Sequence, residues 1–116
     1  MNYEDRVTKE YVEDAIANAG PKFAMGSYVG TGTHGLNNRT SVTFDFVPKM
    51  VFVTVKSTIT NKFFFWFTGV TSVQARDANS GMACSLTEQT LSWYSNNSAA
   101  EQYNSSGTIY NWLAIY

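Results

Sequence analysis

The chain has 116 residues, with eight Lys and Arg against nine Asp and Glu, and its formal net charge is −1. Charged residues are only 15% of the chain and are scattered, which excludes the basic patch that binding to nucleic acid or an anionic membrane requires. The start of the sequence is charged and has no signal-peptide core, and no stretch approaches the roughly 18 apolar residues of a membrane span. We therefore expect a soluble product made in the cytoplasm, without membrane insertion.

Residues 1–22 are predicted to form an N-terminal helix and linker. Acidic side chains load the early turns of residues 8–19, and Gly20 followed by Pro21 ends the helical pattern. Val12 and Ile16 lie on one narrow apolar stripe. A helix this short is marginal alone, so we expect it to dock onto the rest of the chain or to bundle with copies of itself.

Residues 23–116 form the second predicted unit, in which apolar residues follow the two-residue period of β-strands. Strands are expected at residues 25–29, 42–47, 50–55, 63–67, 82–87, 90–94 and 108–115, with a weaker candidate at 70–76 and a short one at 101–103. Turns are expected after residue 47, at 58–61 and at 88–89. About seven or eight such strands behind one short α-helix predict a mainly β fold, an antiparallel β-sandwich of jelly-roll type.

Residues 63–67 are five consecutive aromatic residues, FFFWF. A strand directs alternate side chains to opposite faces, so Phe64 and Trp66 share one face and the other three rings share the other. Phe64 and Trp66 alone would expose roughly 300 to 500 Å² on a bare face, close to the largest patch that soluble monomers tolerate. We therefore expect a homo-oligomer with Phe64, Trp66, Val12 and Ile16 in its interface; cover by the helix or loops of the same chain is the alternative.

No catalytic arrangement is favoured by the sequence. His34 is the only histidine, and Cys84, the only cysteine, follows a strand period that makes it a core residue rather than a nucleophile. A glycosidase needs a pair of carboxylates, and no motif marks such a pair among the available acids, which are Asp45, Asp77, Glu88 and Glu101. We expect a protein without catalytic residues.

Metal and cofactor sites are not expected either. Residues 77–81 have the D-x-N-x-G opening of a calcium loop but lack its later bidentate acid, so a plain turn is favoured. The glycine-rich residues 30–35 lead into a strand rather than a helix and carry no lysine at the spacing of a nucleotide-binding loop. A single histidine cannot make a His-rich metal site.

Aromatic residues beside polar loops are the better candidates for ligand binding. An aromatic ring can stack on a sugar while neighbouring amides bond its hydroxyls. The predicted ligand-binding residues are Tyr94, Asn96, Asn97, Tyr103 and Asn104. Trp93, which is in register with Leu91, is expected in the core.

Three stretches resemble a known family. Residues 26–53, GSYVGTGTHGLNNRTSVTFDFVPKMVFV, are similar to the G-x-Y-x-G-x-G and S-x-T-F-D-F-x-P-K-x-V pattern of tail-fibre-like receptor-binding modules from phages and prophages of Gram-positive hosts. Residues 91–116, LSWYSNNSAAEQYNSSGTIYNWLAIY, resemble the closing stretch of these modules, although related domains end near A-I-G and this chain ends at Tyr116. Residues 5–20 resemble their helical leaders.

The resemblance implies a non-enzymatic, all-β module of a virion tail, assembled as a trimer with other tail proteins. It also implies adhesion to a host cell-surface polysaccharide, for which we expect contacts from the loops at residues 31–38 and 95–107. Two alternatives stay open: a monomeric lectin-like carbohydrate-binding module without a virion role, and a small glycan hydrolase.

Overall fold

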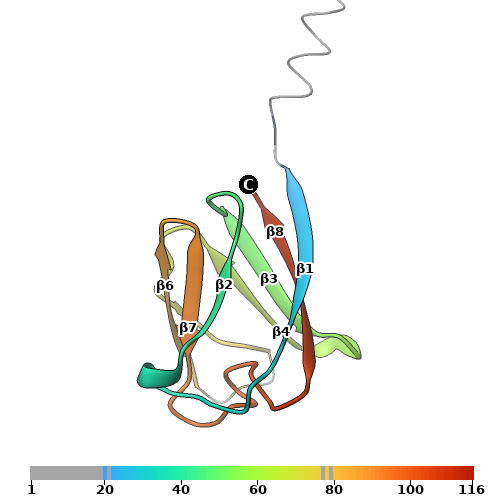
Figure 1. Ribbon diagram of the computed structural model, residues 1–116, viewed down its shortest axis with the longest axis vertical. Coiled ribbons are helices and arrows are strands. Elements are labelled where there is room, and N and C mark those ends of the chain that lie inside the picture. Colours follow the sequence, from blue (N-terminus) through green and yellow to red (C-terminus); the bar gives the residue numbers. More distant parts are fainter. Residues whose placement is uncertain (1–19, 21, 77, 79) are drawn as a thin grey trace, which may run out of the picture.

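The computed structural model describes residue 20, residues 22–76, residue 78 and residues 80–116, without the side chains of residues 58–61. In this part of the chain, eight strands form two antiparallel four-stranded sheets that pack against each other (Figure 1). This confirms the predicted mainly β, two-sheet architecture. The predicted helix, with Val12 and Ile16, lies outside the described residues. No helix within the described ranges has the length and apolar character that crossing a membrane requires.

The two sheets are called sheet A and sheet B below. Sheet A has the spatial order β1-β8-β3-β4, with bounds Phe23–Val29, Ile109–Ile115, Met50–Val55 and Thr58–Phe67. Sheet B has the order β2-β7-β6-β5, with bounds Thr40–Thr43, Thr90–Tyr94, Met82–Thr87 and Ser72–Val73. A 3₁₀ turn, η1 (Leu36–Asn38), lies in the connection from β1 to β2.

The core lies between the sheets, because in strands of both sheets every second residue is more buried than its neighbours. Sheet A contributes Val51, Val53, Phe64, Trp66, Tyr110 and Ala114, and sheet B contributes Met82, Cys84, Leu91 and Trp93; none is more than 7% exposed. The rings of Phe64 and Trp93 meet edge to face across the two sheets, with centroids 5.2 Å apart. The predictions that Cys84 and Trp93 are core residues are confirmed.

The aromatic run of β4 is covered within the chain on the face that we expected a second copy to cover. Phe64 is 2% exposed and Trp66 is 1% exposed, and the Trp66 indole N–H donates to the carbonyl of Val70 at 2.9 Å. The predicted interface at Phe64 and Trp66 must therefore be corrected, since sheet B of the same chain covers both residues. The uncovered side is the opposite one, where Phe65 and Phe67 are 45% and 52% exposed.

Strand boundaries agree with the predictions in the hairpins and differ at irregular points. β3 and the β6–β7 hairpin have the predicted bounds, and Glu88 takes the left-handed conformation (φ 55°) in its turn. The predicted turn at residues 58–61 is wrong, because the chain turns at residues 56–57 and β4 then runs without interruption. A register shift between Thr54 and Val55 accompanies this early turn.

Three predicted strands are shorter than expected or absent. β2 ends at Thr43, and residues 44–48 continue as irregular chain in which Phe44 is buried and Val47 is 58% exposed. Only two residues of the expected strand at 70–76 pair, as β5. Residues 101–103 form turns instead of a strand.

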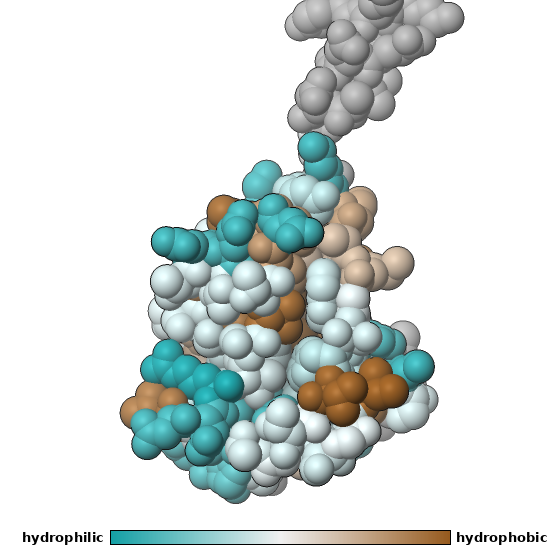
Figure 2. All heavy atoms as spheres, viewed as in Figure 1, coloured by the Kyte–Doolittle hydropathy of each residue, from teal (hydrophilic) through white to brown (hydrophobic). Residues whose placement is uncertain are grey.

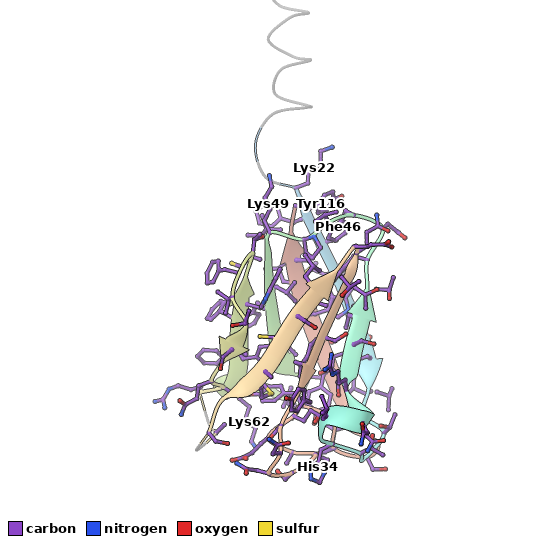
Figure 3. The ribbon with its side chains drawn as sticks, turned by 90° about the vertical axis from the view of Figure 1, so that its left-hand side faces the viewer. Lys22, His34, Phe46, Lys49, Lys62 and Tyr116 are labelled. Carbon is purple, nitrogen blue, oxygen red and sulfur yellow. The ribbon has the colours of Figure 1, made fainter. Side chains whose placement is uncertain are left out.

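The chain enters and leaves the sandwich at the same end. Lys22 and Tyr116 pair through two backbone hydrogen bonds of 2.8 and 2.9 Å. Figure 3, which looks onto the side of sheet B, shows Lys22 and Tyr116 at one end and His34 at the other. The loops at residues 30–39 and 95–108 therefore lie at the end remote from Lys22 (Figure 1). We call this remote end the loop end.

Candidate functional site

The two long loops of the loop end are joined by a buried amide. Gln102 is completely buried, and its Oε1 accepts hydrogen bonds from the backbone N–H groups of Gly35 and Ser95, both at 2.9 Å. Its Nε2 donates to the carbonyl of Asn38 at 2.8 Å and to the hydroxyl of Thr40 at 3.0 Å. Since every polar atom of this side chain is bonded, Gln102 fixes the position of one loop relative to the other.

Asn104 makes a second connection between the same loops. Its Oδ1 accepts from the Thr31 backbone N–H at 3.0 Å, and its Nδ2 donates to the Thr31 hydroxyl at 2.7 Å and to the Thr33 carbonyl at 2.9 Å. Asn104 is 4% exposed and Tyr103 is 1% exposed. Their predicted role as ligand-facing residues must be corrected, because burial leaves neither side chain a surface on which a ligand can rest.

Tyr103 belongs instead to an aromatic cluster beneath these loops. Its left-handed backbone (φ 58°) directs its carbonyl to the Tyr28 hydroxyl, which donates to it at 2.7 Å. Tyr28 stacks on Tyr110 with centroids 5.1 Å apart. Burial, reinforced by the neighbouring Tyr110 and Tyr103, raises the pKa of Tyr28 far above the ordinary tyrosine value, so its hydroxyl remains a donor. The loops of the loop end therefore pack on a hydrogen-bonded aromatic cluster.

The outward face of sheet B is covered by hydroxyl groups. Strand register places these side chains in rows across the sheet: Thr43–Thr90–Thr87 in one row, Ser41–Ser92–Ser85 in the next, and Tyr94–Ala83–Ser72 in the third. The hydroxyls of Thr43 and Thr90 are 2.9 Å apart. In Figure 2, pale and teal residues cover the side of the molecule where β6 and β7 lie. We call this surface the hydroxyl face.

A hollow lies where the hydroxyl face meets the loop end. Its volume is about 440 Å³, and it is lined by Ser72, Ser80, Gly81, Met82, Ala83, Tyr94, Asn96 and Asn97. The Asn97 side-chain amide donates to the Ser80 hydroxyl, which ties the 95–107 loop to the chain before β6. The structure thus brings together three predicted residues, Tyr94, Asn96 and Asn97, on one concave surface. We call it the Tyr94 hollow.

A smaller hollow of about 150 Å³ adjoins it across Tyr94. Its lining includes Arg39, Ser85 and Ser92. The Arg39 guanidinium carbon lies 5.4 Å from the centroid of the Tyr94 ring, within the range of a cation–π contact. Together the two hollows form a shallow polar trough with one aromatic ring in its middle. Such a trough can stack on an apolar ring surface and hydrogen-bond to hydroxyls around it.

No family model, curated protein or solved structure matches this chain.

Cys84 and His34 do not come together as a nucleophile and base. Cys84 faces the core, where burial raises the pKa of its thiol and so disfavours the thiolate that a nucleophile needs. Its thiol points to the carbonyl of Val70 at 3.9 Å, and His34 lies on the exposed surface of the loop end. Among the described residues no group of three or more His, Cys, Asp and Glu side chains is placed to hold a metal ion. Asp77 and the centre of the calcium-like stretch lie outside the described residues.

Sequence reasoning missed Arg39, Ser72 and Ser80 as neighbours of Tyr94. A signal for the hydroxyl face was present, because Ser and Thr alternate with apolar residues along 41–43, 84–87 and 90–93. The pairing of these strands was not readable from their sequences, so the rows could not be predicted. The placement of Ser80 depends on an irregular loop with no periodicity.

Proposed function

We propose that this chain is a non-enzymatic carbohydrate-binding module of a phage or prophage tail, which contacts a host surface polysaccharide through the Tyr94 hollow. The observation that carries the proposal is an aromatic ring set among hydroxyl and amide groups on a concave surface. Tyr94 is partly exposed there, with Asn96 and Asn97 on the loop side and Ser72 and Ser80 opposite.

The chemistry of the hollow fits a neutral sugar ring. The C–H side of a sugar packs on an aromatic face, and the hydroxyls at its rim need donors and acceptors that hydroxyl and amide side chains both supply. Among the residues that the structure describes, none that lines either hollow is acidic, and Arg39 is the only charged one. A strongly basic ligand therefore has no counter-charge here, whereas a neutral or weakly acidic polysaccharide does not need one.

The position of the hollow fits an attached adhesin. Lys22, where the predicted leader joins the sandwich, lies at the opposite end from His34 and the loop end (Figure 3). A module fixed to a particle through its leader would present the loop end outward. The buried bonds of Gln102 and Asn104 keep that end rigid, which lowers the conformational cost of binding.

Glycan-array screening of the wild-type chain, followed by titration of the best ligand, tests this proposal. Tyr94→Ala should weaken binding at least about tenfold, roughly 1.4 kcal/mol, because the stacking surface is removed. Asn97→Ala should weaken it less. Tyr116→Ala is a matched control, since this tyrosine lies at the other end and stacks on Phe46 with centroids 3.7 Å apart.

Two outcomes count against the proposal. Binding that survives Tyr94→Ala would remove the hollow from the contact, and release of reducing sugar from the bound glycan would favour the hydrolase alternative. Mass spectrometry of purified tail particles tests the virion role separately, because a lectin-like module would bind the same glycan without being part of a particle.

A further inference from the structure

The outward face of sheet A is an uncovered apolar surface. Strand register builds two complete rows across all four strands, Phe23–Ile115–Met50–Phe67 and Met25–Leu113–Phe52–Phe65. All eight residues of these rows are apolar. We call this surface the apolar face.

Exposure on the apolar face is large for side chains of this kind. Phe23 is 62% exposed, Met25 is 80% exposed, and Phe65 and Phe67 are each about half exposed, at 45% and 52%. With a fully exposed side chain of this size near 200 Å², these four residues alone leave roughly 500 Å² of apolar surface in water. Val29 and Ile109 form a further exposed apolar pair nearer the loop end, beyond the polar pair of Ser27 and Asn111. In Figure 2, apolar residues gather along the β1 side of the molecule.

The rings on this face are already packed against one another. Phe52 lies 4.8 Å from Phe65 and 5.8 Å from Phe63 between ring centroids, and Phe63 lies 5.7 Å from Phe65. Side chains ordered in this way lose little further rotamer freedom when a partner covers them. The surface is therefore prepared for a contact at low entropic cost.

We infer that a second copy of this chain packs its own apolar face against this one. The outward strand positions of sheet A carry no charge among the described side chains. These positions lie in the ranges 23–29, 50–54, 63–67 and 109–115. The partner must therefore offer an uncharged apolar surface of similar shape, and another copy offers one. Stacked β-sheets generally pack face to face about 10 Å apart, and two copies of this face can pack in that way.

The area of the apolar face is sufficient for a contact between two copies. A pairing of two identical faces buries roughly 500 Å² on each side, about 1,000 Å² in total, which is the lower bound of a specific interface. This contact moves the predicted oligomer interface from Phe64 and Trp66 to the opposite face of the same strand. It does not rest on the carbohydrate proposal, because the Tyr94 hollow lies on the other sheet.

Light scattering coupled to size exclusion, on the full chain at about 1 to 100 µM, tests the inference. The wild-type chain should show the mass of at least two copies of 12.9 kDa. The variant Met25→Ser with Phe65→Ser should dissociate at concentrations at least tenfold higher. The matched control is Leu36→Ser with Val47→Ser, because these side chains are 52% and 58% exposed outside the apolar face; it should associate like the wild type.

Three results would contradict a contact between two apolar faces. A wild-type monomer throughout the concentration range would overturn the inference, and so would association that persists in the face variant or that is lost equally in the control. The spectrum and melting temperature of each variant establish that it folds. If the first face variant does not fold, Phe23→Ser with Phe67→Ser takes its place, because it removes the two phenylalanine rings of the neighbouring row.

Discussion

The outer surfaces of the two sheets differ in chemistry although the sheets share one core. Outward residues of sheet B are mostly Ser and Thr, whereas two full rows of sheet A are Phe, Met, Leu and Ile. Inward residues of both sheets reach full burial in this core, since Val53 of sheet A and Trp93 of sheet B are each 0% exposed. The stability of the sandwich therefore does not demand this difference, since hydroxyl residues suit an outward strand position well. An apolar outer face on only one sheet indicates a second contact, and a hydroxyl face on the other indicates exposure to water or to a polar ligand.

The largest expected effect is on the free energy of unfolding, and it distinguishes the buried face of β4 from its exposed face. Phe64→Ala should lower the free energy of unfolding by about 3 to 5 kcal/mol, because it leaves a cavity against Trp93 and Tyr103. Phe65→Ala, one residue away on the apolar face, should cost the isolated chain less than about 1.5 kcal/mol, because its ring is already half in water. Urea denaturation of both variants at low concentration measures the difference.

Equal losses of stability in Phe64→Ala and Phe65→Ala would contradict the distinction between the buried and the exposed face of β4. They would mean that the apolar face is as much an interior as the core, even in dilute solution. A Phe65→Ala cost that grows with protein concentration would sharpen it instead, because it would show that another copy covers the ring.

A smaller effect is expected from the buried amide that holds the loop end beside the hydroxyl face. Gln102→Leu keeps the volume but leaves the N–H groups of Gly35 and Ser95 without their acceptor, so it should cost about 2 to 4 kcal/mol. The matched control is Gln89→Leu in the exposed β6–β7 turn, which should change stability by less than about 0.5 kcal/mol. Denaturation midpoints measure both.

The same pair of variants also connects stability with the Tyr94 hollow. Asn96 and Asn97 directly follow Ser95, whose backbone N–H is held by Gln102, so Gln102→Leu should weaken glycan binding as well as stability. A variant that is destabilised but binds normally would show that the hollow keeps its shape without this support.

Much of the sandwich was predictable from period alone. The alternation of apolar and polar residues predicts which side chains of a strand share a face. It predicted the β6–β7 hairpin, the strand β3 and the opposite faces of Tyr110 and Leu113. What alternation does not record is which of two apolar faces is inside. Residues 63–67 are aromatic on both faces, so the sequence could show that two covers were needed but not which face receives sheet B.

The predicted ligand-binding residues fall into an exposed and a buried group for a similar reason. Tyr94 ends a strand, and its outward direction follows from the burial of Trp93 beside it. Tyr103 and Asn104 lie in turns, where no period distinguishes a side chain that faces water from one that supports a loop. Amides are suited to both tasks, and only the bonds to Thr31 and Thr33 show which one Asn104 performs.

The smallest expected effect tests whether the hydroxyl face is a surface or a structural network. Thr43→Val with Thr90→Val removes an exposed hydroxyl pair but keeps shape and strand preference, so stability should change by less than about 1 kcal/mol. These residues lie two rows away from Tyr94, so binding of a short oligosaccharide should be unchanged. If a long polysaccharide binds this variant several-fold more weakly while the short ligand does not, the ligand extends along the rows of hydroxyls. If the free energy of unfolding falls by about 2 kcal/mol or more, those hydroxyls hold the sheet together. The hydroxyl face would then differ from the apolar face because it stabilises the fold, and not because it contacts a ligand.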